Sequence, residues 1–242
     1  DILAEIAQES AATAIHALHH YEPWWRNAER ALAAALPASC TLILHDGNYL
    51  LPPGTVRTGA GSLFKIYTPF WRALNTHMPP APPLPAPSHI TAPDIWPYSD
   101  TLADWHLLPT KPDWARQFSD EWTPGEAGAF ARLEDFDDQA ARYDSRRNLP
   151  SIEGSSRVSA HLHFGEISPA TLWHRLSGKG GEVETYLKEL VWRDYAQNLI
   201  LAMPEYGRAN GRPAFDAFPW RDGADPSVAA DLAAWQHGRT GY

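Results

Sequence analysis

The first third of the chain alternates short apolar runs with an alanine-rich segment. Residues 13–19 alternate between apolar and polar positions, which predicts a short strand, and residues 41–45 form a β-branched and leucine run that predicts a buried strand. Residues 23–36 lie between them and carry apolar positions at helical spacing, which predicts an amphipathic helix. Strand, helix and strand in this order predict a parallel α/β unit, and residues 68–77 predict a further helix.

A proline-dense segment follows at residues 78–97. Repeated proline removes backbone donors and fixes φ, so this segment cannot form a regular helix and is expected to be an extended connector. The sequence therefore predicts an α/β part at residues 1–77, a connector at 78–110 and a second domain at 111–242.

Beyond the connector the apolar spacing is helical throughout, which predicts an all-α domain. Four of the expected helices have a start signal, either a proline in the first turn or a side-chain cap. The first expected helix begins at Pro112 and ends at Phe118, and the second begins with a capping box at Thr123–Glu126 and ends at Phe136. A third is capped by Ser155 or Ser156 and ends at His163, and a fourth begins at Ser168–Pro169 and ends at Gly178. Two more are expected at residues 182–202 and 227–236.

The helix at 182–202 contains the sequence YLKELVWRDYAQN, which starts at Tyr186. Helical spacing places Tyr186, Glu189 and Arg193 along one stripe, with Trp192 beside Glu189. An indole next to charged groups suits a flat aromatic ligand with polar edges, such as a nucleobase. The alternative is an ordinary surface pair of Glu189 with Arg193 and a core tryptophan at 192.

A serine cluster at Ser155, Ser156 and Ser159 with Arg157 follows Gly154. Free backbone N–H groups and hydroxyls at a helix start form an anion site that fits a diphosphate, and the alternative is a plain helix cap. His161 and His163 are two positions apart and point in different directions on a helix, so no metal is expected. No G-x-S-x-G motif indicates a hydrolase.

The formal charge of −9 over 242 residues argues against a generally basic nucleic-acid-binding surface. A DNA contact would need a local patch, for which the candidates are Arg146, Arg147, Arg157, Lys188 and Arg193. Cys40 is the single cysteine, which excludes a disulfide framework. No apolar run reaches membrane-spanning length and no signal peptide is evident, so a cytoplasmic protein with no membrane partner is expected.

Several motifs occur in one order: Asn148–Pro150, Gly154–Ser159, His161–Pro169 and Glu189–Asp194. Their order and spacing resemble the DNA photolyase/cryptochrome family, in the front half of its helical flavin-binding domain. Residues 235–242 resemble the next block of that family, which stops partway, so the chain is expected to be an internal piece of a longer protein. The preceding α/β part resembles the end of a Rossmann-like antenna domain.

The resemblance implies FAD as the cofactor and UV-damaged DNA as the partner. It places the flavin against the serine cluster, with Trp192 facing the same cavity. The implied flavin-binding residues are Tyr143, Ser155, Ser156, Arg157, Val158, Ser159, Tyr186 and Arg193. Val158 stands where leucine is common, and Tyr186 stands where tryptophan is frequent.

The resemblance implies that Glu189 and Trp192 are catalytic and bind the lesion, while Arg147 reaches the DNA backbone. Glutamate and tryptophan together favour a lyase that splits cyclobutane pyrimidine dimers with light and an electron from reduced FAD. The alternatives are a cryptochrome-type photoreceptor and a flavin-free helical DNA-binding module.

A second, antenna chromophore of unknown identity is also compatible with the resemblance. Trp24 and Trp25 stand where some members place an Asn-Glu pair for a folate, so a folate held in that manner is not expected. A monomer is expected.

Overall fold

The computed structural model describes residues 2–94 and 96–241. Ile95, in the expected connector, and Tyr242, at the end of the last resembling block, lie outside the described residues. The contacts divide the chain into two compact units, of which the first ends at Pro204 and the second begins at Glu205. Both expected domains begin within the first unit, and the boundaries at 77 and 110 stay predictions.

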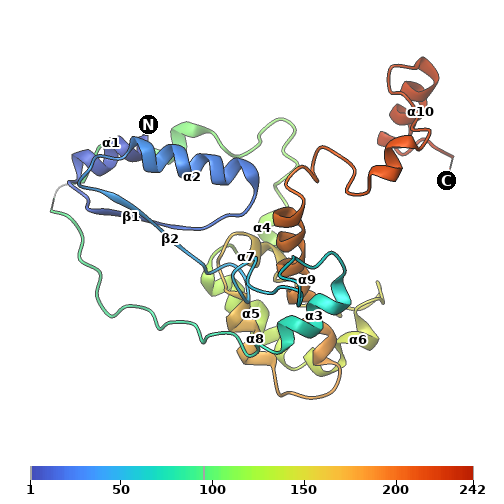
Figure 1. The fold of residues 1–242 in the computed structure, drawn as a ribbon, viewed down its shortest axis with the longest axis horizontal. Helices are drawn as coiled ribbons and strands as arrows, with labels where there is room; N and C mark the ends of the chain where they lie inside the picture. Colours follow the sequence, from blue (N-terminus) through green and yellow to red (C-terminus); the bar gives the residue numbers. More distant parts are fainter. Residues whose placement is uncertain (1, 95, 242) are drawn as a thin grey trace. The chain divides into compact units, whose positions relative to one another are not determined.

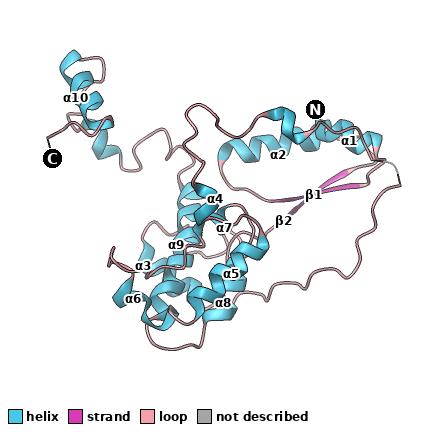
Figure 2. Ribbon diagram, turned by 180° about the vertical axis from the view of Figure 1, so that it is seen from behind, coloured by secondary structure: helices cyan, strands magenta, loops and turns pink. Residues whose placement is uncertain are grey.

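The first unit begins with an α/β segment (Figure 1). Its elements are α1 (Ile2–Glu9), β1 (Ala14–Leu18), α2 (Pro23–Ala35) and β2 (Thr41–His45). The two strands pair in parallel, from Ala14 opposite Thr41 to Leu18 opposite His45, which confirms the predicted unit (Figure 2). The prediction that β2 is buried is wrong: four of its five residues are exposed, because the sheet of the described residues has two strands and α2 covers part of it.

A loop leads from β2 to α3 (Tyr67–Asn75), and residues 76–101 contain no helix or strand among the described positions, which agrees with the extended connector. A short 3₁₀ helix, η1, follows at Leu102–Trp105. The helix expected from Pro112 to Phe118 does not form; turns occupy that stretch and α4 covers Phe118–Glu121. Trp114 and Phe118 remain exposed there, so the segment buries no apolar face that would stabilise a longer helix.

The helical part packs around the long helix α9 (Val183–Ala202), which contacts α3, α6 and α8 (Figure 1). The other elements are α5 (Glu126–Asp137), η2 (Ala140–Arg142), α6 (Tyr143–Arg146), α7 (Ser159–His163) and α8 (Pro169–Leu176). Fully buried side chains of α3, α8 and α9, including Phe70, Leu172 and Val191, form the centre of this core.

The expected caps are confirmed at one helix and wrong at two. Ser168 caps α8 by accepting a hydrogen bond from the N–H of Thr171 at 3.0 Å. Gly125, with φ of 96°, occupies the cap position of α5, so Thr123 does not cap it. Helix α7 begins at Ser159, and Val158 at its cap position makes no side-chain hydrogen bond. The helix therefore begins later than a cap at Ser155 or Ser156 would predict.

The second unit contains η3 (Pro213–Ala217) and α10 (Pro226–Gln236). Asp225 caps α10 through the N–H of Ser227 at 2.8 Å, and Arg221 pairs with Asp231 at 2.7 Å. Among the described residues, no helix has both the length and the apolar character that a membrane crossing requires.

Candidate functional site

Helix α9 is the platform of the site. Its sequence contains no glycine or proline, and the side it buries includes Tyr186, Leu190, Val191 and Asp194. Glu189 and Trp192 lie at the margin of this buried side and keep partial exposure. The helix therefore fixes the backbone of these two residues through its core packing.

Glu189 forms an ion pair and a hydrogen bond with the guanidinium of Arg147, at the end of α6. The alternative of a surface pair between Glu189 and Arg193 is wrong, because Arg193 turns toward the loop before α3. The hydrogen bond to Glu189 raises the pKa of Arg147, whose guanidinium also lies 5.3 Å from the ring centre of Tyr143. A carboxylate and a guanidinium, both part-exposed, thus meet on one surface.

Trp192 is 45% exposed, so the alternative of a core tryptophan is wrong. Its indole stacks on Tyr67, the first residue of α3, with ring centres 3.6 Å apart and planes 5° apart. The hydroxyl of Tyr67 donates to the backbone carbonyl of Lys188 at 2.8 Å. Sequence reasoning missed Tyr67, which lies one residue before the helix expected at 68–77; the signal that could have found it is its aromatic spacing with Phe70 and Trp71.

Arg193 donates to the carbonyl and the side-chain oxygen of Asn48, at 3.3 and 3.1 Å, and to the carbonyl of Leu162 at 3.4 Å. Burial lowers the pKa of Arg193. Its role in holding the cofactor stays a prediction, because in the structure its hydrogen bonds join α9 to the loop before α3.

Two more residues of α9 hold the same loop. The carboxylate of Asp194 accepts the N–H groups of Leu50 and Leu51, at 3.2 and 3.1 Å, and Asn198 accepts the N–H of Gly54 at 3.0 Å. Burial raises the pKa of Asp194 to about 7. The loop at 48–54 is therefore fastened to α9 by three side chains.

The serine turn, residues 154–159, lies against the end of α6. A side chain at Gly154 would place its Cβ 2.5 Å from the carbonyl oxygen of Arg146, so only glycine allows this approach. Arg157 adopts a left-handed backbone with φ of 55°, and Val158 is buried. The serine turn is thus a tight loop whose shape depends on the close backbone contact at Gly154 and the left-handed backbone at Arg157.

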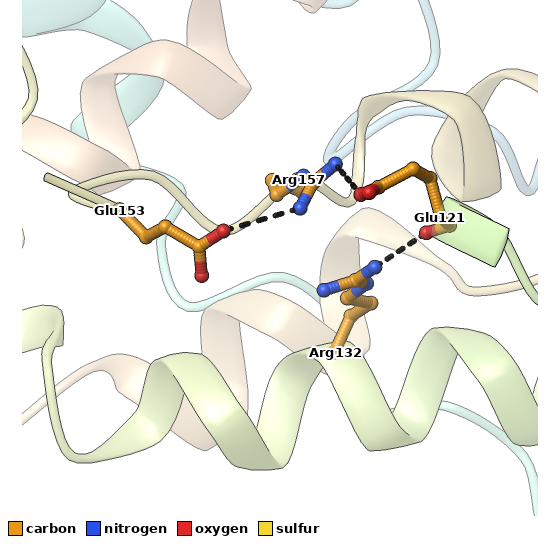
Figure 3. Close-up of polar contacts among 4 residues, drawn as sticks. All are labelled: Glu121, Arg132, Glu153 and Arg157. Carbon is orange, nitrogen blue, oxygen red and sulfur yellow. Dashed lines mark hydrogen bonds and ion pairs between the residues drawn. The ribbon is translucent and has the colours of Figure 1, made fainter. Parts of the chain in front are cut away.

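Arg157 lies in a polar network next to the serines (Figure 3). Its guanidinium pairs with Glu121 at 3.0 Å and Glu153 at 3.4 Å and lies 5.5 Å from the ring of Trp122. Arg132 donates to the backbone carbonyl of Glu121 at 2.6 Å. A cavity of about 210 Å³ opens here; its lining residues are Arg132, Asp135, Phe136, Gln139, Glu153, Ser155, Ser156 and Arg157.

Tyr186 supports the serine turn from the core side. Its hydroxyl donates to the hydroxyl oxygen of Ser156 at 3.1 Å, and its ring contacts Phe136 and Tyr143 at 4.8 and 5.1 Å between centres. Burial raises the pKa of Tyr186 to about 12, so the phenol remains a donor at neutral pH. The structure therefore brings Tyr143, Ser156 and Tyr186 together.

Trp192 is not among the residues that line the cavity beside the serines, and the expectation that Trp192 and the serines face one flavin cavity stays a prediction. At 3.6 residues per turn, the six positions from Tyr186 to Trp192 place the two side chains roughly 120° apart around the helix axis. Tyr186, which bonds Ser156, and the exposed Trp192 therefore point from different sides of α9.

The chain matches two family models, DNA photolyase over residues 1–88 and the FAD binding domain of DNA photolyase over residues 186–242. The deoxyribodipyrimidine photo-lyase of Agrobacterium fabrum is 39% identical over 248 residues, which cover 100% of this chain and 51% of the relative. The protein of that name from Escherichia coli is 29% identical over 259 residues, with coverage of 100% and 51%.

A crystal structure of a bacterial class III photolyase from Agrobacterium tumefaciens superposes with a TM-score of 0.90 at 39% identity. The match covers 100% of this chain and 50% of that one. The chain belongs to the DNA photolyase family. It spans about half the length of the curated relatives it matches.

In this photolyase-family chain, the matched FAD-binding segment includes Tyr186, Glu189, Trp192 and Arg193 but not the serine turn. The donors around the serine cavity nevertheless fit a diphosphate, since two guanidinium groups and two hydroxyls line it. Two carboxylates, of Asp135 and Glu153, line it as well, and Glu153 engages Arg157. An anion in this cavity would compete with Glu153 for that guanidinium.

The histidines expected to point apart do so. His161 is buried and bonds Glu166 at 2.5 Å between Nδ1 and Oε2, whereas His163 packs on Phe164. No group of three or more metal-ligating side chains forms among the described residues of this photolyase-family chain. The antenna chromophore and the monomeric state stay predictions.

Proposed function

We propose that the protein carrying this chain repairs cyclobutane pyrimidine dimers in DNA with light, as a deoxyribodipyrimidine photo-lyase. The observation that carries the proposal is the open face of α9, where the carboxylate of Glu189 and the part-exposed indole of Trp192 lie three residues apart. Membership of the family and the names of the relatives support the same activity.

Trp192 would bind the lesion by stacking. A dimer must leave the DNA helix to react, and the stacking it loses is replaced by an aromatic side chain, a contact worth roughly 1–3 kcal/mol per base. The part-exposed indole of Trp192 provides such a surface. Its selectivity for damage follows because an intact base pair resists leaving the helix more than a lesion does.

Glu189 and Arg147 would act on the edge and the backbone of the extruded nucleotides. A carboxylate accepts base N–H groups, and a guanidinium binds phosphate through charged hydrogen bonds. Their mutual ion pair holds both groups in one orientation before DNA arrives. The Arg147 guanidinium is a local cation of the kind through which a chain of net charge −9 would contact phosphate.

FAD would supply the light-absorbing group and the electron that splits the cyclobutane ring. Ser155, Ser156 and Arg157 would hold its diphosphate, since these groups supply hydroxyls and a cation around the cavity. Tyr186 would keep Ser156 in place through the hydrogen bond between their hydroxyls.

The test compares Trp192→Ala with Trp25→Ala, an exposed tryptophan on α2 outside this face. Binding to UV-irradiated and unirradiated oligo(dT) is measured by fluorescence anisotropy, and loss of dimers under blue light is followed in parallel. We expect Trp192→Ala to weaken binding to irradiated DNA at least about tenfold, with little effect on unirradiated DNA. Equal weakening on both DNAs would exclude Trp192 from lesion binding, and intact flavin photochemistry without dimer loss would indicate a photoreceptor.

A further inference from the structure

The face of Trp192 that is turned toward α3 is covered by Tyr67. The two rings lie 3.6 Å apart between centres with planes 5° apart, which is the geometry of stacked bases. Tyr67 belongs to α3 and Trp192 to α9, and these helices pack against each other. The indole is still 45% exposed, so its uncovered side faces solvent.

Tyr67 is itself fixed in two ways. Its hydroxyl donates to the carbonyl of Lys188 at 2.8 Å, and burial, followed by the nearby Glu189 carboxylate, raises the pKa of Tyr67, so the donor is retained. Tyr195 packs edge-on against both rings, with centres 5.6 Å from Tyr67 and 5.6 Å from Trp192. The plane of the indole is therefore set by two aromatic neighbours, Tyr67 on α3 and Tyr195 on α9.

The stack is not the arrangement that two free aromatic rings prefer. Such rings favour offset or edge-to-face contact over a parallel sandwich. A near-parallel stack with centres at 3.6 Å therefore reflects the packing of α3 on α9 and the Tyr67 hydrogen bond. Because the helices impose it, the orientation of Trp192 exists before any ligand binds.

We propose that Tyr67 is a positioning residue for lesion binding: it holds Trp192 so that the free indole face receives an extruded pyrimidine, giving a stack of tyrosine, tryptophan and base. The proposal rests on the proposed function and adds a residue from outside the FAD-binding segment. Ordering a free side chain opposes binding, so a side chain that is already ordered binds more tightly. Tyr67 removes that ordering step for Trp192.

The experiment uses the purified protein with four substitutions. Tyr67→Leu removes the stacked ring, Tyr67→Phe keeps the ring and removes the hydroxyl, and Trp71→Leu removes another aromatic of α3, one that packs on Trp173 and Lys188. Trp192→Ala is combined with Tyr67→Leu as a double variant. The readout is the ratio of dissociation constants for unirradiated and UV-irradiated oligo(dT), with far-UV circular dichroism to verify folding.

We expect Tyr67→Leu to lower this ratio about three- to tenfold. Tyr67→Phe, which keeps the stacked ring but loses the hydrogen bond, should lower it less, and Trp71→Leu should keep it within about twofold. In the Trp192→Ala background, Tyr67→Leu should change the ratio no further, since the residue it positions is gone. A merely structural role would lower binding to both DNAs together and leave the ratio unchanged.

The proposal is overturned when Tyr67→Leu keeps the wild-type ratio, or when its effect persists in the Trp192→Ala background. Should Tyr67→Leu unfold at the assay temperature, Tyr67→Met, an unbranched side chain of similar length, replaces it with the same expectation. The proposed function fails separately, when the wild-type protein itself does not distinguish irradiated from unirradiated DNA.

Discussion

Asp194 makes the stability of the fold depend on pH in a direction that the structure determines. Its side chain is 1% exposed, and burial raises its pKa from 3.8 to about 7, against the opposing effect of the Leu50 and Leu51 N–H groups. Because the folded state then binds this proton more tightly than the unfolded state, the stabilising contribution is complete below about pH 4 and is lost as the pH rises through about 7.

The size of the effect follows from the shift. Between pH 5 and pH 8, Asp194 alone should lower the free energy of unfolding by about 3 kcal/mol, since each pKa unit corresponds to about 1.4 kcal/mol. Asp194→Asn cannot ionise, so it removes this dependence. The amide nitrogen also leaves Leu50 or Leu51 without an acceptor, which costs about 1–3 kcal/mol at every pH.

The assay is urea unfolding of both proteins at pH 5, 6, 7 and 8, monitored by far-UV circular dichroism. The wild-type free energy should fall more steeply with pH than that of Asp194→Asn, by about 3 kcal/mol over the range. Asp120→Asn, at an exposed carboxylate of α4, should keep the wild-type slope. If the plots of unfolding free energy against pH are parallel for the wild type and Asp194→Asn, the reasoning that the Asp194 carboxyl loses its proton only as the pH rises through about 7 is refuted.

Two further predictions concern the serine turn and the proposed phosphate contact of Arg147. Gly154→Ala should lower the free energy of unfolding by about 1–3 kcal/mol, since its Cβ would lie 2.5 Å from the Arg146 carbonyl, whereas Gly59→Ala, with open space around it, should stay within about 0.5 kcal/mol in the same urea titration. Arg147→Ala should reduce by about one the slope of log K against log salt for DNA binding; an unchanged slope would mean that Arg147 does not contact phosphate.

The elements with strong local signals could be predicted from the sequence. The strands at 14–18 and 41–45 and the helix at 183–202 agree with their expected ranges to within one residue. An alternating pattern, a continuous apolar run and helical spacing, respectively, extend through them without interruption. Helix α7 was placed too early because a serine before a helix is a common cap, whereas here the backbone at Arg157 has φ of 55° and delays the helix to Ser159. The exposure of β2 could not be read from its own residues, since burial depends on which elements cover it.

The sequence predicts which residues share one side of the helix at 182–202, but it does not predict the residues that contact them. Helical spacing placed Glu189 beside Arg193, yet the partner of Glu189 is Arg147, 42 residues earlier in the chain. Trp192 likewise lies on Tyr67, which belongs to another helix. Local periodicity gives the side of a helix that a residue occupies, while the partner depends on tertiary packing that no short pattern encodes.

Three consecutive residues of α9, Trp192, Arg193 and Asp194, contact two different parts of the chain because their side chains point in different directions. Successive residues of a helix are rotated by roughly 100°, so Trp192 faces α3 and solvent while Arg193 and Asp194 turn to the loop at 48–54. The loop leads into α3, whose first residue carries the ring beneath Trp192. The hydrogen bonds of Asp194 thus fasten the loop that leads to Tyr67, so a change that loosens this loop should alter the orientation of the Trp192 indole without replacing either ring.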